Sequence, residues 1–307
     1  MCGIIGLISE GTSVNYILDG LKQLQNRGYD SAGICMNLDD NFILKKYASE
    51  EKENAIFKLN KNLNSFKNSN IGIGHTRWAT HGSKNDSNSH PHISSDGNFA
   101  LVHNGIIENY KELKNFLIKE KYKFKSQTDS EVIVNLLSYQ YKQFGNVELA
   151  IKNTINKLEG TWGLAIMYLE DINSIYCTRH GSPLLVSNND NISMVVSEQS
   201  GFCGLVNNYI VLENNDICVL KKNSIITTIS YIKKNINLMK QDLTPSPYKY
   251  WTEKEINEQI YSTETAISLG GRLLENSVKL GGIEDHKDVL SNIDNLILLG
   301  CGTSYHA

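Results

Sequence analysis

The sequence has 307 residues, of which 40% are hydrophobic, and its formal net charge is -3 at pH 7. This length and hydrophobic fraction predict a packed core, with one domain and the start of another. With this small net charge, the chain lacks the overall positive charge that binding to nucleic acid or an anionic membrane needs, so small-molecule chemistry is expected. No apolar run reaches the roughly 18 residues that span a bilayer, and no basic segment precedes the first one, which predicts a cytoplasmic protein.

Cysteine and histidine spacing argues against a metal centre. The cysteines are Cys2, Cys35, Cys177, Cys203, Cys218 and Cys301, without CxxC spacing, so neither a zinc site nor a disulfide framework is predicted. His75, His81, His90 and His92 fit no helical metal-binding pair and have no thiolate nearby. We therefore expect no metal and no cofactor.

Short runs of β-branched and aromatic residues, bounded by Gly, Asn or Asp, predict ten strands. They occupy residues 3–9, 31–37, 71–78, 99–105, 161–169, 174–179, 183–187, 192–197, 208–213 and 216–222. Helical periodicity predicts helices over 13–28, 108–122 and 128–145, and the Asn/Lys-rich segment 58–70 is expected to be a solvated helix or loop. Many strands with a few helices indicate an α+β domain built in layers.

The best linker candidate contains Pro245 and Pro247, in "LTPSPYKYW". After it, residues 252–276 predict a helix, and "NLILLG" (295–300) predicts a buried strand that leads into a Gly-rich turn and a helix start. A buried strand of this kind normally belongs to a βα unit and needs partners. The pattern therefore predicts that the 307 residues are a piece of a longer protein.

The first chemical candidate is Cys2, in the opening "MCGIIG". Removal of Met1 would give one residue both a thiol, with a pKa near 8.5, and an α-amino group, with a pKa of about 7.7 to 8.0. A nucleophile activated by its own amine is a known form of covalent catalysis. From its position alone, Cys2 could equally well be a buried structural residue that begins an edge strand.

Two further motifs offer groups that bind a polar substrate. In "HNGIIENY", Asn104 and Gly105 follow an apolar strand, where a side-chain amide and a backbone N–H suit an oxyanion hole, although Asn-Gly also marks tight turns. In "HTRWATHG", Arg77 suits a bidentate carboxylate contact and Trp78 suits an apolar wall or lid. A surface ion pair and a core tryptophan are the alternatives for these two residues.

The segment "SQTDSEVI" has two competing interpretations. Thr128 and Glu131 have the spacing of a capping box, which makes Asp129 an acidic residue in the first helical turn. Asp129 is equally suited to hold a substrate ammonium group.

Five ordered motifs, "CGIIG", "NRGYDSAGI", "HTRWATHG", "HNGIIENY" and "RHGSPL", together resemble the glutamine:fructose-6-phosphate aminotransferase (isomerizing) family, the glucosamine-6-phosphate synthases. "KEINEQ" and "CGTSYHA" are similar to its inter-domain segment and to the opening of its sugar isomerase (SIS) domain. The resemblance implies a four-layer αββα N-terminal-nucleophile sandwich, the class II glutaminase domain, over residues 2–235. A linker at 236–252 and the truncated beginning of an α/β SIS domain at 253–307 would follow.

The resemblance also implies residue roles. Cys2 would attack the side-chain amide of glutamine, with its own amine as the base, while Asn104 and Gly105 hold the oxyanion. Arg77 would bind the substrate carboxylate, and Asp129 its α-ammonium group.

The remaining implied roles concern the surroundings of the nucleophile and the sugar site. Arg27 and Gly28 would shape the space around Cys2, Thr80 and His81 would line the pocket, and Trp78 would gate an internal ammonia passage. Cys301, Gly302, Thr303 and Ser304 would form a sugar-phosphate cradle, as backbone N–H groups do at helix N-termini.

The expected partners are glutamine and, for the full-length protein, fructose 6-phosphate, with a homodimer as the expected assembly. Two alternatives remain. The chain could be another class II amidotransferase, such as an amidophosphoribosyltransferase, or a catalytically inert regulatory fragment.

Overall fold

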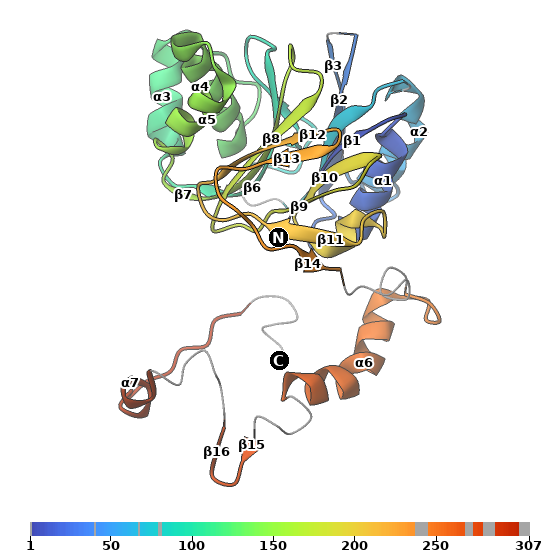
Figure 1. Cartoon of the computed structure of the whole chain (residues 1–307), viewed down its shortest axis with the longest axis vertical. Coiled ribbons are helices and arrows are strands. Elements are labelled where there is room, and N and C mark those ends of the chain that lie inside the picture. Colours follow the sequence, from blue (N-terminus) through green and yellow to red (C-terminus); the bar gives the residue numbers. More distant parts are fainter. Residues whose placement is uncertain are drawn as a thin grey trace. The chain divides into compact units, whose positions relative to one another are not determined.

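Two antiparallel sheets lie face to face in the first of the chain's two units, Met1–Leu243. The computed structural model describes residues 2–39, 41–66, 68–78, 82–236, 245–267, 273–278 and 286–300. Within these residues, the first sheet has the order β14-β11-β9-β10-β1-β4-β2-β3 and the second β13-β12-β8-β7-β6-β5. Figure 1 shows both sheets between two groups of helices.

The strands of the first sheet are β1 (Gly3–Ser9), β2 (Ser31–Leu38), β3 (Asn41–Ala48), β4 (Ile71–Arg77), β9 (Leu185–Asn188), β10 (Ile192–Val196), β11 (Asn208–Val211) and β14 (Lys234–Asn235). Those of the second are β5 (His92–Ile93), β6 (Phe99–Ile107), β7 (Gly160–Tyr168), β8 (Ser174–His180), β12 (Ile217–Lys221) and β13 (Ser224–Ile226). The central strands are apolar on both faces because both faces are covered. In β1, Ile4 and Ile8 pack between the sheets, whereas Ile5 and Leu7 pack toward the helices.

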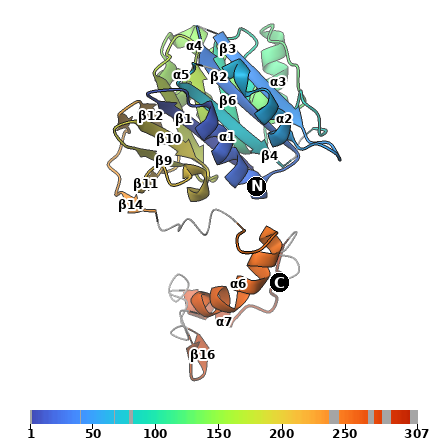
Figure 2. The ribbon, with the colours of Figure 1, turned by 90° about the vertical axis from the view of Figure 1, so that its right-hand side faces the viewer.

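Helices cover the outer face of each sheet (Figure 2). The first sheet is covered by α1 (Val14–Gln23) and α2 (Ala55–Lys61), with 3-10 turns at Leu24–Arg27, Leu63–Phe66 and Gln199–Phe202. The second is covered by α3 (Tyr110–Lys119), α4 (Asp129–Phe144) and α5 (Val147–Ile155). Three apolar cores separate four layers in the order αββα, which confirms the predicted fold class of this unit.

The ten predicted strands are all present, but strands β3, β5, β13 and β14 and helix α5 were not predicted, and the interpretation of segment 58–70 needs correction. Strand β3 was not predicted, because two lysines interrupt its apolar pattern. The segment 58–70 is not simply solvated: it contains the end of α2 and a 3-10 turn, and Leu59 and Phe66 are fully buried in the core below them.

The second unit, Thr244–Ala307, differs more from its prediction. The helix expected over 252–276 is α6 (Trp251–Ala266), and a short ladder of β15 (Leu273–Leu274) with β16 (Ser277–Val278) replaces its end, before α7 (Lys287–Ser291). Residues 295–300 form no strand among the described residues, and Leu296 to Leu299 are 73–93% exposed. A strand requires a hydrogen-bonded neighbour, and the described part of this unit provides none for that segment. No helix among the described residues is long and apolar enough to cross a membrane.

Candidate active site

Strand alternation brings the candidate nucleophile to the space between the sheets. Cys2 directly precedes β1. Because alternate residues of a strand point to the same face, Cys2 lies on the same face as Ile4 and Ile8, which face the second sheet. On the neighbouring strand β4, His75 and Arg77 lie on the same face as Ile73, so they face the same space. A thiol and a guanidinium group therefore reach the same end of the inter-sheet layer.

The Cys2 thiol is held by the peptide backbone at Trp78. The backbone N–H of Trp78 donates to Sγ of Cys2 at 3.2 Å, and Sγ lies 3.6 Å from the carbonyl oxygen of Trp78. Gly28 lies directly against this peptide: a Cβ at position 28 would lie 2.7 Å from the carbonyl carbon of Arg77 and 2.8 Å from the nitrogen of Trp78. Glycine is therefore required at position 28 by this close approach of two backbones.

Asn104 bonds to the same terminal residue from the second sheet. Its Nδ2 donates to the carbonyl oxygen of Cys2 at 2.8 Å, and its Oδ1 lies 3.0 Å from Nε2 of His75. Burial lowers the pKa of His75 to about 3, even though bonds to Asn104 and to the carbonyl of His103 favour its charged form. Neutral His75 thus carries its proton on Nε2, since both partners are acceptors, and this bond orients the Asn104 amide with its nitrogen toward Cys2.

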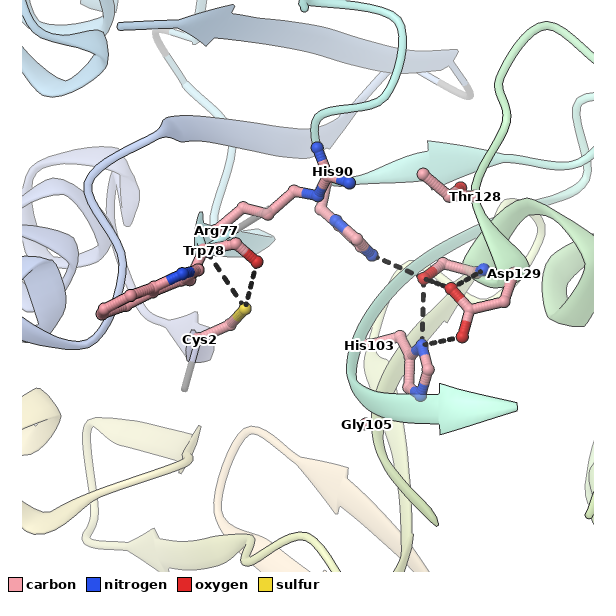
Figure 3. A pocket seen from close by; sticks show the side chains of 9 residues that line it. Cys2, Arg77, Trp78, His90, His103, Gly105, Thr128 and Asp129 are labelled. Atoms are coloured by element: carbon pink, nitrogen blue, oxygen red, sulfur yellow. Dashed lines mark hydrogen bonds and ion pairs between the residues drawn. The ribbon is translucent and has the colours of Figure 1, made fainter. Parts of the chain in front are cut away.

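A small open cavity lies beside Cys2 (Figure 3). Its lining is Cys2, Arg77, Trp78, His90, His103, Gly105, Thr128, Asp129 and Ser130. Figure 3 shows Cys2, Arg77 and Trp78 on one side and His103, Gly105 and Asp129 on the other.

Among the described lining residues, the cavity contains one arginine and one carboxylate, both buried. Arg77 is 4% exposed, and desolvation lowers its pKa although the nearby Cys2, Asp129 and Asp30 oppose this shift. Asp129 is 5% exposed; its Oδ2 accepts from the backbone N–H of Ile107 at 2.9 Å and its Oδ1 from that of Ser130 at 3.0 Å. The two opposite charges suit a zwitterionic ligand, such as a free amino acid.

The N-terminus of α4 holds Asp129 in place. Of the predicted capping box, the Thr128 cap is present and the return bond from Glu131 is not. The Thr128 hydroxyl accepts from the backbone N–H of Glu131 at 3.3 Å, as a helix cap does. The Glu131 carboxylate, however, accepts from the backbone N–H groups of Lys125 and Ser126, at 2.7 and 2.6 Å, instead of returning to Thr128. Asp129 is thus a first-turn residue and also lines the cavity, so the two interpretations of this residue are compatible.

The remaining predicted residues divide into two groups. Arg27 ends the 3-10 turn Leu24–Arg27, next to Gly28, and its side chain is outside the described part. Thr80, His81, and the predicted phosphate residues Cys301, Gly302, Thr303 and Ser304 also lie outside the described residues.

Four lining residues were not predicted for this site: His90, His103, Thr128 and Ser130. Ser130 Oγ lies 2.7 Å from Nε2 of His90 and 2.9 Å from Nδ1 of His103, so it joins the two rings. His103 directly precedes the predicted Asn104 in "HNG", and Ser130 directly follows the predicted Asp129 in "TDS". This adjacency is the only signal that the sequence offers for the two residues.

The histidine cluster is a packed core feature. His75 stacks on His90 at 4.2 Å between ring centroids, and His90 meets His92 edge-on at 4.7 Å. Burial lowers the pKa values of His90 and His92 well below 6.5, so their rings are neutral at pH 7. In the described part of the chain, no three His, Cys, Asp or Glu side chains are placed to hold a metal ion.

Comparison with known proteins identifies the family. The model of the glutamine amidotransferase domain matches residues 61–262, more than half of the chain. The chain belongs to the glutamine amidotransferase domain family. This match confirms the amidotransferase part of the predicted resemblance, and it includes the motifs around Arg77 and Asn104.

Similar curated proteins carry more specific names. A probable glutamine--fructose-6-phosphate aminotransferase [isomerizing] of Acanthamoeba polyphaga mimivirus is 37% identical over 100% of this chain and 51% of its own length. The enzyme named glutamine--fructose-6-phosphate aminotransferase [isomerizing] in Caldanaerobacter subterraneus is 36% identical, over 100% of this chain and 50% of its own. The chain therefore spans about half the length of the curated relatives it matches.

Among solved structures, a glutamine phosphoribosylpyrophosphate amidotransferase from B. subtilis matches with a TM-score of 0.61 and 23% identity, over 74% of this chain and 48% of that one. At this identity the likeness concerns the fold alone. It agrees with the αββα sandwich described above.

Proposed function

We propose that this chain hydrolyses glutamine, with Cys2 as the nucleophile. The observation that carries the proposal is the cavity in which the Cys2 thiol, the Arg77 guanidinium group and the Asp129 carboxylate meet. Glutamine presents an α-carboxylate and an α-ammonium group, which match Arg77 and Asp129, and its side chain would extend from these two charges toward Cys2.

The reaction follows from these positions. The α-amino group of Cys2, once Met1 is removed, takes the thiol proton while Sγ attacks the amide carbon of the glutamine side chain. Asn104, whose amide already donates one N–H to the Cys2 carbonyl, and the backbone N–H of Gly105 would hold the oxyanion. The protonated α-amine returns its proton to the leaving nitrogen as this intermediate collapses, which breaks the C–N bond, releases ammonia and leaves a γ-glutamyl thioester. Water then hydrolyses the thioester to glutamate and the free thiol.

The experiment is glutamate release by the purified chain and by its Cys2→Ala and Cys203→Ala variants. Cys203 is the matched control because it is a partly exposed thiol that does not line the cavity. We expect Cys2→Ala to abolish glutamate release and adduct formation with a glutamine-like diazoketone, and Cys203→Ala to change neither. Glutamate release by Cys2→Ala at the unmodified rate would refute the proposal.

For the whole protein, we propose transfer of the ammonia to fructose 6-phosphate to give glucosamine 6-phosphate, since the names of the similar mimiviral and Caldanaerobacter proteins state this aminotransferase activity. The assignment of 2–235 to the glutaminase, 236–252 to a linker and 253–307 to a sugar isomerase domain is part of this proposal. So are the phosphate role of residues 301–304, a homodimer and a cytoplasmic location. Glutamine hydrolysis by the whole protein should increase with fructose 6-phosphate and not with ribosyl substrates.

A further inference from the structure

The loop of residues 82–91 joins β4 to β5 and lies on the inner face of the hairpin β2–β3. Nζ of Lys46, on β3, donates to three backbone carbonyls of this loop: Ser87 at 3.1 Å, Ser89 at 2.6 Å and Pro91 at 3.2 Å. The backbone N–H of Ala48 adds a bond of 2.7 Å to the Asp86 carboxylate. One lysine therefore binds three backbone carbonyls of a loop that does not pair with a neighbouring strand.

A glycine on the neighbouring strand allows the loop to approach so closely. Gly33 of β2 pairs with Lys46, and a Cβ at position 33 would lie 2.1 Å from the carbonyl oxygen of His90. Any other residue would push the loop off the hairpin and away from the lysine. Gly33 thus leaves space for the loop on the hairpin, and Lys46 binds the loop there.

The opposite side of the same loop holds the N-terminus of α4. Asn88 exchanges two hydrogen bonds with Gln127: the Gln127 backbone N–H donates to its Oδ1 at 2.9 Å, and its Nδ2 donates to the Gln127 Oε1 at 3.2 Å. His90 lies 2.7 Å from the Ser130 hydroxyl. Just beyond the loop, Nε2 of His92 lies 3.1 Å from the Thr128 hydroxyl. The three residues 128–130, which line the cavity, are thus supported by the segment that Lys46 holds.

We propose that Lys46 is a positioning residue of the glutamine site: its ammonium group fixes the 82–91 loop on the hairpin, and the loop fixes Thr128, Asp129 and Ser130 at the cavity. The inference rests on the glutamine hydrolysis proposed above. Lys46 itself touches no substrate, so its effect is on the placement of Asp129 and its neighbours.

Titration of Lys46 gives this arrangement a pH dependence. An ammonium group has three N–H donors, one for each of the three carbonyls, and a neutral amine has two. Desolvation lowers the pKa of Lys46 to about 8; Glu131 of α4, Cys35 of β2 and Asp86 of the loop oppose this shift, and Arg77 of β4 adds to it. His92 of β5 also faces the lysine. As the pH rises through about 8, the loop loses one of its three bonds to Lys46.

Three variants test the proposal: Lys46→Met, which removes all donors at similar length; Lys46→Arg, which stays charged at every working pH; and Lys45→Met as the control. Lys45 is next on the same strand, so its side chain leaves the opposite face of the sheet. The readouts are the steady-state KM and kcat for glutamine, and hydrogen exchange of peptides that cover 82–91 and 127–131 at pH 7 and pH 9, corrected for intrinsic exchange rates.

For Lys46→Met we expect at least about tenfold faster exchange in both peptides and about tenfold higher KM with a smaller change in kcat, the order that loss of charge-assisted bonds produces. In the unmodified chain, corrected exchange of 82–91 should rise between pH 7 and pH 9. In Lys46→Arg this rise should be absent, and Lys45→Met should behave as the unmodified chain.

Unchanged exchange at 127–131 in Lys46→Met would overturn the proposal. If Lys46→Met does not fold, the comparison of Lys46→Arg with the unmodified chain decides, and an equal rise with pH in both would overturn it. An unmodified chain that releases no glutamate would refute the proposed function instead, and the exchange experiment would still decide whether Lys46 holds the loop.

Discussion

Protonation of His75 should destabilise the fold in mild acid. This ring is fully buried, donates through Nε2 to Asn104 and to the carbonyl of His103, and has its pKa lowered from 6.5 to about 3 by burial. The unfolded chain binds a proton on this histidine below pH 6.5, whereas the folded chain does not until about pH 3. The stability that the neutral ring contributes is therefore complete above pH 6.5 and is lost as the pH falls from 6.5 toward 3.

The size of the effect follows from the two pKa values. Between pH 7 and pH 5, proton binding by the unfolded chain alone lowers the free energy of unfolding by about 2 kcal/mol, and the full shift corresponds to roughly 5 kcal/mol. His90 and His92, whose pKa values are also lowered by burial, should add losses of the same sign.

Urea unfolding at pH 7 and pH 5, followed by far-UV circular dichroism, measures this difference. His75→Gln removes the titrating ring, so its loss between pH 7 and pH 5 should be smaller than that of the unmodified chain by about 2 kcal/mol. The variant is less stable at both pH values, and only the difference between them is compared. His286→Gln is the control, since His286 is exposed in the second unit. An equal pH difference in His75→Gln and the unmodified chain would refute the reasoning.

Two further predictions concern backbone positions of the site. Gly28→Ala places a methyl group 2.8 Å from the nitrogen of Trp78. It should slow alkylation of Cys2 by about 100-fold, because the peptide that bonds the thiol must move; Gly11→Ala, whose Cβ meets nothing within 4 Å, should react at the unmodified rate. Thr128→Ala removes the cap of α4 and the contact with His92, so it should cost about 1 kcal/mol in urea unfolding and raise the KM for glutamine. Asn146→Ala, which removes the cap of α5, should cost as much with no change in KM, and an equal KM effect would contradict the role of the α4 terminus.

The sequence predicted the layered fold well because its central strands are covered on both faces and are therefore apolar throughout. Strand β3 escaped prediction for a reason that only the tertiary structure supplies: the charge of Lys46 is bound by loop carbonyls from residues 87–91. The helix expected over 252–276 ends at Ala266, so helical periodicity alone did not find its end.

At the site, the sequence predicted three residues that line the cavity, but not the side chains that hold them in place. Cys2, Arg77 and Asp129 stand in motifs with recognisable chemistry, and the cavity brings them together. The bonds of Ser130 to His90 and His103 span 40 and 27 residues of sequence, and no local pattern reports contacts of that range.

The position of β1 has a consequence for the order in which the first sheet can be assembled during synthesis. Strand β1 is a central strand: it pairs with β4 through residues 71–76 and with β10 through residues 192–196. During synthesis, β1 lacks one of its two neighbours until β10, which lies far along the chain, has been made. Such distant pairing slows folding and leaves an apolar strand exposed meanwhile. The first sheet can therefore close around β1 only after β10 has been made, although the direct partners of Cys2, Trp78 and Asn104, come earlier in the chain.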